Sequence, residues 1–393
     1  MTDNFKIEVF SDWSQALRII DEWNNLNSKS GVSHPFTTYE WFDCWYKAYC
    51  NPSRARVILV REKGNNNLRA VFPGMLLQMK KGGIPLNCFS YAGNGHSPRC
   101  GIIAKKDDRE AIRAALEAIW NSLGEKINLA ILMSIDEDSL THHVLNNLEL
   151  PHLSLHIENS FESPAFDLSK GWESYFASRS KNFRHRVRQG RNQAMRLDGL
   201  TYDVNSGETI SKETIDRLKS LDFKTWQHRS GSGLFSTVEN EKFYSSLLQS
   251  CTIKNKMIVC FSKIGGRDVA FELGILFNET AFLLKCGYDP EFSNCSPGLL
   301  VQAYLSEYVS TLGFKEIDLV GEITEEKVRW QTHRRKHANY WLINNRPIGG
   351  KILLTEFKAY KVLREVARIV KADKGQFKSS CNTGKTTIEE DGE

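Results

Sequence analysis

Apolar positions between residues 269 and 322 follow two periods, which predict two strands, a helix and a third strand. The runs 269–277 and 280–286 are separated by two residues, a spacing typical of an antiparallel hairpin. Between residues 300 and 312, apolar residues recur in pairs every four positions, as on one face of a helix. Residues 315–320 then alternate, which predicts a short buried strand. We expect the functional site to be organised around this stretch.

The loop before the predicted helix ends in Ser296-Pro297-Gly298. Ser296 is a candidate N-cap, Pro297 suits the first helical position, and Gly298 leaves room for a ligand. The free N–H groups of a first helical turn lie at the positive end of the helix dipole, where they bind phosphate. The pattern therefore predicts a phosphate site at this corner.

The rest of the chain predicts further elements of both kinds. Strands are expected at 6–10, 56–60, 70–79, 88–91, 127–133, 152–156, 164–167, 257–264 and 339–343. Helices are expected at 13–27, 38–48, 107–123, 140–148, 178–196, 214–228, 239–249, 325–333 and 353–370. Many of the strands are joined by short turns, so we expect an α/β (α+β) fold with mixed, mostly antiparallel sheets flanked by helices.

The two halves of the chain repeat each other. One helix ends in Ser122-Leu123-Gly124 and another in Thr311-Leu312-Gly313, and each runs into a strand. Paired strands and a loop with Ser-Pro precede both helices. The order predicts a duplicated α/β unit. We expect domains at 1–168 and 169–371, followed by a polar, disordered tail at 372–393.

Two features of the N-terminal half allow a core or a binding interpretation. Trp41, Cys44, Trp45 and Ala48 share one helical face, a pattern typical of core and compatible with a binding surface. The loop 93–99 contains two glycines, a histidine and an arginine, and fits either a ligand-binding loop or an exposed turn.

The predicted helix 178–196 is the most basic part of the chain. Its basic residues include Arg179, Lys181, Arg184, Arg186, Arg188, Arg191 and Arg196. The helix is either a solvated connector or a surface that binds an anion, because so many like charges repel one another unless they are offset. The bound anion could be a nucleotide phosphate, a tRNA end or a lipid-linked phosphate.

The helix 353–370 also has a basic face. This face either packs on the second domain or contacts a membrane surface.

Composition narrows the class of protein. The 393 residues are 41% hydrophobic and 25% charged, as in an ordinary globular protein. The formal net charge of +5 suggests a modest preference for anionic ligands and does not require DNA binding. Nine cysteines without a C-x-x-C pair fit reduced thiols in the cytoplasm. The sequence shows neither a signal-peptide pattern nor an apolar stretch of membrane-spanning length.

Metal and covalent chemistry are not expected. His333 and His337 have i,i+4 spacing, but Arg334, Arg335 and Lys336 between them would repel a cation. Cys286 has no histidine close in sequence, so a buried thiol is a better interpretation than a covalent nucleophile.

At this point the order of short motifs in the second half resembles a known family. The motifs are Trp226, Gly231-Ser232-Gly233, Phe235, Gly266 to Ala270, Tyr288-Asp289-Pro290, Ser296 to Leu300, Asp318, Gly321-Glu322, Lys327 and Trp330. Their order is similar to that of CelD-like bacterial acetyltransferases of the GNAT superfamily, strongest over residues 165–345. These proteins are in turn similar to the Fem peptidyltransferases, which carry two GNAT domains in tandem.

The resemblance implies a cytoplasmic acyltransferase that moves an acyl group from acetyl-CoA or another acyl-CoA to an amine or hydroxyl. The acceptor would be a small molecule or an amino sugar in envelope or polysaccharide biosynthesis, with peripheral contact to the inner face of the membrane as a further expectation. The CoA pyrophosphate would lie on Asn294, Ser296, Gly298, Leu299 and Leu300. One departure weakens this inference: the usual Arg/Gln-x-x-Gly-x-Gly/Ala loop is here Phe292 to Gly298, with a single glycine and no leading Arg or Gln.

The implied mechanism is direct transfer. The N–H groups near Cys286 and Gly287 would bind the oxyanion, and Glu272, Asp289 or Asp318 would remove the proton. Asp318 equally fits a salt bridge to Lys327 or Lys285. Acceptor-binding side chains are expected among Trp226, Lys285, Glu322, Lys327, Arg184 and Arg188.

Two other functions remain open from the sequence. A Fem-like enzyme would take its aminoacyl group from charged tRNA held on the basic helix, and its binding would depend steeply on salt. A non-catalytic tandem GNAT protein would only bind a partner or an envelope lipid.

Overall fold

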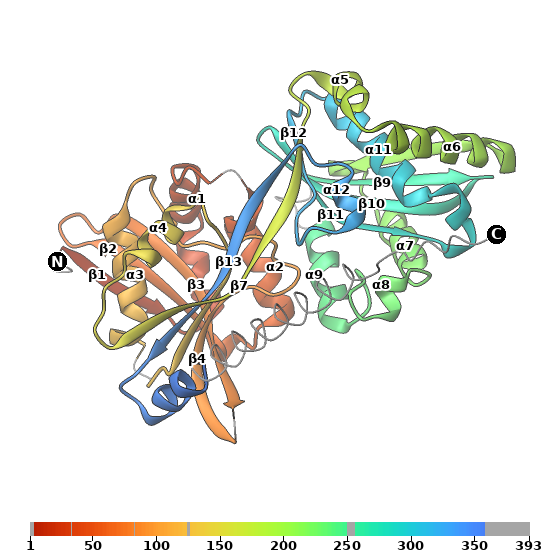
Figure 1. The fold of residues 1–393 in the computed structure, drawn as a ribbon. Helices are drawn as coiled ribbons and strands as arrows, with labels where there is room; N and C mark the ends of the chain where they lie inside the picture. Colours follow the sequence, from red (N-terminus) through yellow and green to blue (C-terminus); the bar gives the residue numbers. More distant parts are fainter. Residues whose placement is uncertain (1–3, 33, 82, 124–125, 250–255, 358–393) are drawn as a thin grey trace, which may run out of the picture.

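The computed structural model describes residues 4–32, 34–81, 83–123, 126–249 and 256–357. Its strands form one continuous 13-stranded sheet in the order β1-β2-β3-β4-β6-β13-β7-β12-β11-β10-β9-β8, with the short β5 paired to β3 (Figure 1). This mixed, mostly antiparallel sheet flanked by helices confirms the predicted fold class.

The strands have the following bounds. In the first half they are β1 (Phe5–Phe10), β2 (Ala55–Glu62), β3 (Leu68–Lys81), β4 (Ile84–Tyr91), β5 (Ile103–Ala104), β6 (Leu129–Asp136) and β7 (Leu153–Asp167). In the second half they are β8 (Leu200–Ser206), β9 (Met257–Ile264), β10 (Arg267–Phe277), β11 (Thr280–Tyr288), β12 (Glu316–Asp318) and β13 (His333–Asn344).

The helices lie on the faces and at the ends of this sheet. They are α1 (Ile20–Ser28), α2 (Tyr39–Tyr49), α3 (Arg109–Asn121), α4 (Leu140–Asn146), α5 (Gly171–Ser178), α6 (Lys181–Asp198), α7 (Lys212–Asp222), α8 (Trp226–Arg229), α9 (Val238–Gln249), α11 (Pro297–Thr311) and α12 (Glu325–Val328). A 3₁₀ turn, η5 (Pro290–Cys295), precedes α11. In the described part of the chain, no helix is both long and apolar enough to cross a bilayer.

The two halves share one topology. In the first, α3 joins β4 to the parallel strand β6, with Cys88 beside Leu129. In the second, α11 joins β11 to the parallel strand β12, with Phe282 beside Asp318. The other neighbours in each half are antiparallel. A crossover helix between two parallel strands in both halves matches the repeat seen in the sequence.

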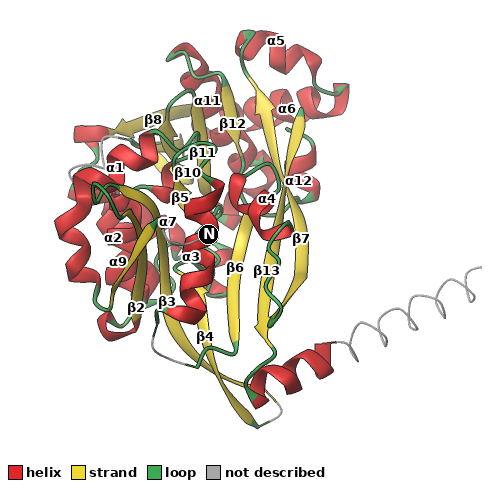
Figure 2. Ribbon diagram, turned by 90° about the vertical axis from the view of Figure 1, so that its left-hand side faces the viewer, coloured by secondary structure: helices red, strands yellow, loops and turns green. Residues whose placement is uncertain are grey.

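The last strands of the two halves are exchanged. β13, from the end of the described chain, pairs with β6 of the first half, whereas β7 of the first half pairs with β12 of the second. β7 and β13 also pair with each other along most of their length, and Figure 2 shows them running side by side. The halves are thereby tied into one sheet. A domain boundary after residue 168 stays a prediction.

The apolar core also joins the halves. Phe36 packs edge-on against Phe282 at a ring distance of 5.4 Å, and Trp41 does so against Phe243 at 5.3 Å. Trp41 and Trp45 are each 1% exposed, so the aromatic stripe of α2 is core. A second cluster around Phe166, Trp172 and Trp330 covers the C-terminal sheet.

Several predicted elements need correction. The expected helix 214–228 is two helices, α7 and α8, because Thr225 accepts a hydrogen bond from His228 N (3.1 Å) and starts a new helix. The expected helix 325–333 ends at Val328, and His333 begins β13, since pairing with β7 overrides the local pattern. Strands expected at 152–156 and 164–167 are parts of the single strand β7. The C-terminal part of the helix 353–370 and the tail lie outside the described residues.

Candidate functional site

The first component of the site is a wedge between β11 and β12. These parallel strands pair at only three positions, from Thr280 beside Glu316 to Phe282 beside Asp318. β11 continues to Tyr288, whereas the chain leaves β12 through Val320 and Gly321, both at positive φ (40° and 57°). The strands therefore part just beyond Phe282, and the open edge of β11 faces the gap.

A cavity of about 440 Å³ opens at this wedge and involves both halves of the chain. Its lining from the second half includes Leu284, Lys285, Val320, Gly321, Glu322 and Lys327. Its lining from the first half and α9 includes Trp41, Asn94, His96, Ser97, Ser134, Phe161 and Tyr244. The cavity thus forms only because the two halves fold together.

The second component is the corner where η5 meets α11. Ser296 is the N-cap residue of α11, as expected, but it is left-handed (φ 51°, ψ 52°) and its side chain makes no capping bond. Its carbonyl instead accepts from Leu300 N at 3.2 Å. Among the described residues, the N–H groups of Gly298 and Leu299 have no partner. Two amides at the positive end of a 15-residue helix are therefore free to bind an anion.

This corner lies against β11. A Cβ placed on Gly298 would be 3.3 Å from the Tyr288 ring and 3.4 Å from Cys286 Sγ. Gly298 therefore lets the start of α11 approach the strand that borders the wedge.

Glu272 is a buried acid on β10, the strand next to β11. It lies on β10 directly opposite Cys286 on β11 and is 2% exposed. Burial raises the pKa of Glu272 to about 8, an effect that the Cys286 side chain and the positive charge of Lys327 partly oppose. Its Oε2 atom has no hydrogen-bond partner in the described structure. A carboxyl group that titrates near neutral pH suits proton transfer.

The other two candidate bases are engaged by protein partners. Asp318 is 0% exposed, accepts from Arg99 Nη2, and lies 3.3 Å from Arg335 Nε. The lysine partner expected from the sequence is thus replaced by two arginines, Arg99 from the loop after β4 and Arg335 from β13. Asp289 accepts from Lys224 Nζ at 2.7 Å and caps η5 through Glu291 N, and these contacts lower its pKa against the effect of burial.

Two lysines give the cavity a positive character. Lys285 Nζ donates to the carbonyl of Ser232 (3.0 Å), and Lys327 Nζ donates to those of Val320 (2.6 Å) and Glu322 (3.2 Å). Burial lowers the pKa of both lysines, and nearby carboxylates partly oppose this effect. With ammonium groups in its wall, the cavity is suited to a ligand that carries negative charge.

Sequence reasoning missed His96 and Tyr244 as cavity residues. His96 Nδ1 lies 2.9 Å from the Tyr244 hydroxyl, and burial lowers the His96 pKa to about 4. Residues 94–98 line the cavity, and Ser97 and Arg99 are buried, so this loop is not an exposed turn. The repeat contained a usable signal, because Ser97-Pro98 corresponds to Ser296-Pro297 in the second half.

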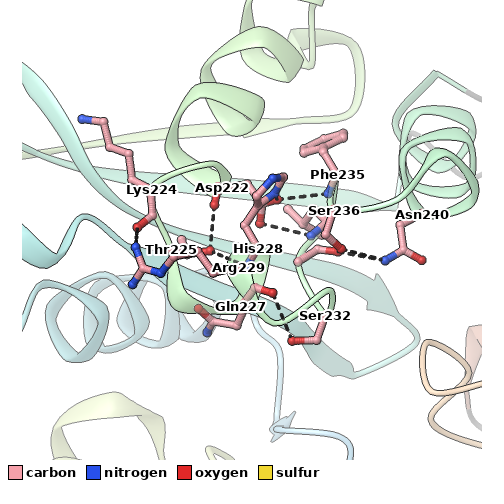
Figure 3. A network of polar contacts seen from close by, with 12 residues as sticks. Asp222, Lys224, Thr225, Gln227, His228, Arg229, Ser232, Phe235, Ser236 and Asn240 are labelled. Carbon is pink, nitrogen blue, oxygen red and sulfur yellow. Dashed lines mark hydrogen bonds and ion pairs between the residues drawn. The ribbon is translucent and has the colours of Figure 1, made fainter.

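A polar network around Asp222 holds the segment after α7 (Figure 3). The buried Asp222 carboxylate accepts from the N–H groups of Leu234 (3.1 Å) and Phe235 (3.0 Å), and it lies 3.0 Å from His228 Nδ1. From the same segment, Gln227 Nε2 donates to the Cys286 carbonyl at 3.1 Å. The segment therefore covers the open end of the strand that borders the wedge.

The remaining predicted site residues lie elsewhere. Trp226 is 57% exposed on α8 and is not part of the cavity lining. Arg184 and Arg188 belong to α6, which packs on η5 and α11 and does not line this cavity. Within the described ranges, no group of histidine, cysteine and acidic side chains is arranged to hold a metal ion.

Comparison with known proteins agrees with this geometry. Residues 181–328 match the family model described as an acetyltransferase (GNAT) domain. No curated protein matches the chain in sequence.

Solved structures share the fold over nearly their whole length. FemX matches with a TM-score of 0.57 and 12% identity, covering 84% of this chain and 96% of that one. The C-terminal domain of a putative lysylphosphatidylglycerol synthetase from Agrobacterium fabrum matches with a TM-score of 0.53 and 10% identity, covering 86% and 95%. A conserved protein of unknown function from Bacteroides thetaiotaomicron matches with a TM-score of 0.51 and 10% identity, covering 83% and 97%.

The sequence match, the repeated strand-helix-strand units and the wedge define the class of this protein as a GNAT-type acyltransferase. Its second half carries the acetyltransferase (GNAT) domain, and its overall fold is of the tandem, Fem-like kind.

Proposed function

We propose that the protein transfers an acyl group from acyl-CoA directly to an amine or hydroxyl of an acceptor in the cavity between the halves. The observation that carries this proposal is the position of the free Gly298 and Leu299 amides beside the wedge between β11 and β12. The two amides would bind the pyrophosphate, and the wedge would admit the pantetheine arm. Bound CoA would supply the activated thioester.

The side chains around the wedge suggest how the protein would assist transfer. We assign proton removal to Glu272, which lies across from Cys286 and whose pKa of about 8 suits a general base. The N–H groups near Cys286 and Gly287 would stabilise the oxyanion. Lys285 and Lys327 favour an acceptor that carries a negative charge. The resemblance to CelD-like proteins favours an amino sugar or another precursor of envelope polysaccharide, and the two lysines favour one that carries negative charge.

Thermal unfolding with and without acetyl-CoA tests the donor. A ligand at a hundred times its dissociation constant stabilises a protein by about 2.7 kcal/mol, so a clear rise in Tm is expected. Gly298→Val should abolish the rise, since a larger side chain there meets Tyr288 and Cys286. Gly64→Val is the matched control, because a Cβ at position 64 meets nothing within 4 Å. No rise for the unmodified protein would contradict the proposal.

A second candidate is transfer of an aminoacyl group from charged tRNA. Its support is the basic helix α6, whose arginines from Arg184 to Arg196 form no ion pairs in the described structure. Binding of charged tRNA whose affinity falls steeply with salt, together with no stabilisation by acetyl-CoA, would favour this candidate over the first.

A further inference from the structure

Left-handed backbone at non-glycine residues is uncommon in this protein, and part of it lies in the wall of the cavity between the halves. Ser134 (φ 51°) and Val320 (φ 40°) both line this cavity. Among the described residues, the other non-glycine positions with positive φ are Asn66, Asp107, Asn278 and Ser296. Strained backbone concentrates at functional sites, so the two positions in the cavity wall require an explanation.

Val320 is the least expected member of this set. The other members are Asn, Asp or Ser, which have short polar side chains without a branch at Cβ. A β-branched residue is a genuine outlier in this conformation. Val320 is also 7% exposed, so it does not belong to a loosely held surface turn.

Side chains on both sides hold the turn in this conformation. Asp318 Oδ1 accepts a hydrogen bond from Val320 N at 2.9 Å, and Asp318 is itself held by Arg99. Lys327 Nζ donates to the carbonyls of Val320 (2.6 Å) and Glu322 (3.2 Å). A strained conformation persists only where its surroundings fix it, and these contacts do so here.

The turn 320–322 presents hydrogen-bond donors to the cavity. Gly321 has no side chain, so it lines the cavity with its backbone. Among the described residues, the N–H groups of Gly321 and Glu322 have no hydrogen-bond partner. A Cβ at position 321 would lie 3.6 Å from Lys327 Nζ, so an ammonium group is beside these amides. The Glu322 side chain is exposed, so its carboxylate can stay in solvent.

The first half adds an independent sign of a polar ligand. Ser97 lines the same cavity, is 3% exposed, and its hydroxyl has no hydrogen-bond partner in the described structure. A buried hydroxyl without a partner is costly, and a polar group of a ligand would remove this cost.

We propose that the turn 320–322 binds the anionic group of the acceptor through the Gly321 and Glu322 amides and the Lys327 ammonium group, while Ser97 binds a hydroxyl of the same molecule. The inference rests on the proposed function, because it concerns the acceptor of that reaction. It defines the acceptor as a hydroxylated molecule with a phosphate or a carboxylate. The strain at Val320 would serve to keep the two amides directed at this group.

Calorimetry with two pairs of sugars tests the assignment. Glucosamine 6-phosphate is compared with glucosamine, and glucuronate with glucose, so that each pair separates the charged group from the rest of the sugar. In one pair, the charged sugar should bind tighter by about tenfold or more, as expected for a charge-assisted hydrogen bond. The pair that shows this preference identifies the anionic group.

Variants separate the two contacts. Gly321→Ala places a methyl group between the turn and Lys327 and should remove the preference for the charged sugar. Gly266→Ala is the matched control, because Gly266 also has positive φ (75°) but a Cβ there meets nothing within 4 Å. Ser97→Ala should weaken the charged and the neutral sugar by the same factor. If Gly321→Ala does not fold, Lys327→Gln tests the loss of preference instead.

Three results would overturn the inference: no measurable binding of any of the four sugars, equal binding within both pairs, or an equal effect of Gly321→Ala and Gly266→Ala. The proposed function fails separately. If a charged sugar binds in a Gly321-dependent manner but releases no CoA from acetyl-CoA, the anion site stands and the function does not. If CoA is released equally fast with glucosamine and glucosamine 6-phosphate, and Gly321→Ala leaves both KM values unchanged, the function stands and the anion site does not.

Discussion

Arg99 of the first half donates to Asp318 of the second half, and both side chains are almost completely buried, at 4% and 0% exposure. The two residues are 219 positions apart in sequence. Arg99 directly follows Pro98, which lines the cavity between the halves, and Asp318 ends β12 where the wedge begins. The pair therefore fixes the loop 93–99 against the strand that shapes the candidate site.

Breaking this pair should destabilise the whole protein. Asp318→Asn leaves the buried guanidinium of Arg99 without its counter-charge, and such losses cost about 3–5 kcal/mol. The free energy of unfolding measured in urea checks this value. Lys315→Ala, which breaks an exposed pair with Glu279, is the control and should cost less than about 1 kcal/mol. If Asp318→Asn lowers the free energy of unfolding by no more than the control does, the buried pair does not stabilise the protein.

The stability of the protein should decrease as pH rises, because Glu272 keeps its proton in the folded state. Its pKa is about 8 in the folded protein and near 4.5 ordinarily, so the native state keeps a proton that the unfolded chain has lost. Unfolding is therefore favoured as pH rises from about 4.5 to about 8, by ~1.4 kcal/mol per unit. From pH 5 to pH 8.5, the free energy of unfolding of the unmodified protein should fall relative to that of Glu272→Gln by on the order of 4 kcal/mol. A difference that is constant with pH would contradict the burial argument.

The same residue should govern the pH dependence of turnover. If Glu272 removes the acceptor proton, kcat/KM should rise with pH until about 8, where the carboxylate form predominates. Glu272→Gln should reduce kcat/KM by about 10²–10⁴-fold and remove this rise. If Glu272→Gln folds and its turnover is unchanged, another group must remove the acceptor proton. The same measurement on Asp318→Asn tests Asp318, which the sequence also offered as a base.

Gly190 should be required for the packing of α6. In an exposed helix, glycine to alanine stabilises by about 1 kcal/mol, but here the added Cβ would lie 2.5 Å from the Cys295 carbonyl oxygen. We expect Gly190→Ala to lower the free energy of unfolding by about 1–3 kcal/mol, as overpacking does. Gln189→Ala, at the neighbouring exposed position, should have little effect. Stabilisation by Gly190→Ala would mean that α6 and η5 can separate freely.

The segment held by Asp222 should open when that carboxylate is changed. Asp222→Asn removes the charged acceptor of two backbone N–H groups, from Leu234 and Phe235, and loss of such buried contacts costs about 1–3 kcal/mol. Limited proteolysis should then cut between residues 226 and 236 faster than in the unmodified protein. Equal cleavage rates would show that other contacts hold this segment over β11.

Local patterns in the sequence were sufficient to predict much of the second half. The hairpin of β10 and β11, the helix α11 and the strand after it follow from periodicity, and the repeated Ser-Pro and Leu-Gly motifs predict the tandem units. By contrast, β13 was predicted as five residues and has 12, because its first half is charged and becomes a strand only by pairing with β7.

Long-range contacts explain what the sequence could not predict about the site. Residues 94–98 line the cavity in a loop that Arg99 ties to Asp318, and Tyr244 reaches His96 from α9. No local period encodes such pairs. The start of α11 at Pro297 follows from the sequence, but the left-handed conformation of Ser296 does not, since serine at a helix start ordinarily caps with its side chain.

Hydrogen exchange of the backbone amides, measured with and without acetyl-CoA, tests the central claim most directly. If the donor docks at the start of α11 and along the open edge of β11, peptides covering residues 284–288 and 297–300 should exchange more slowly when acetyl-CoA is present. The same peptides of Gly298→Val should show no change. Protection that is confined to other parts of the protein, or equal protection in the two proteins, would contradict the assignment of the donor site to the wedge.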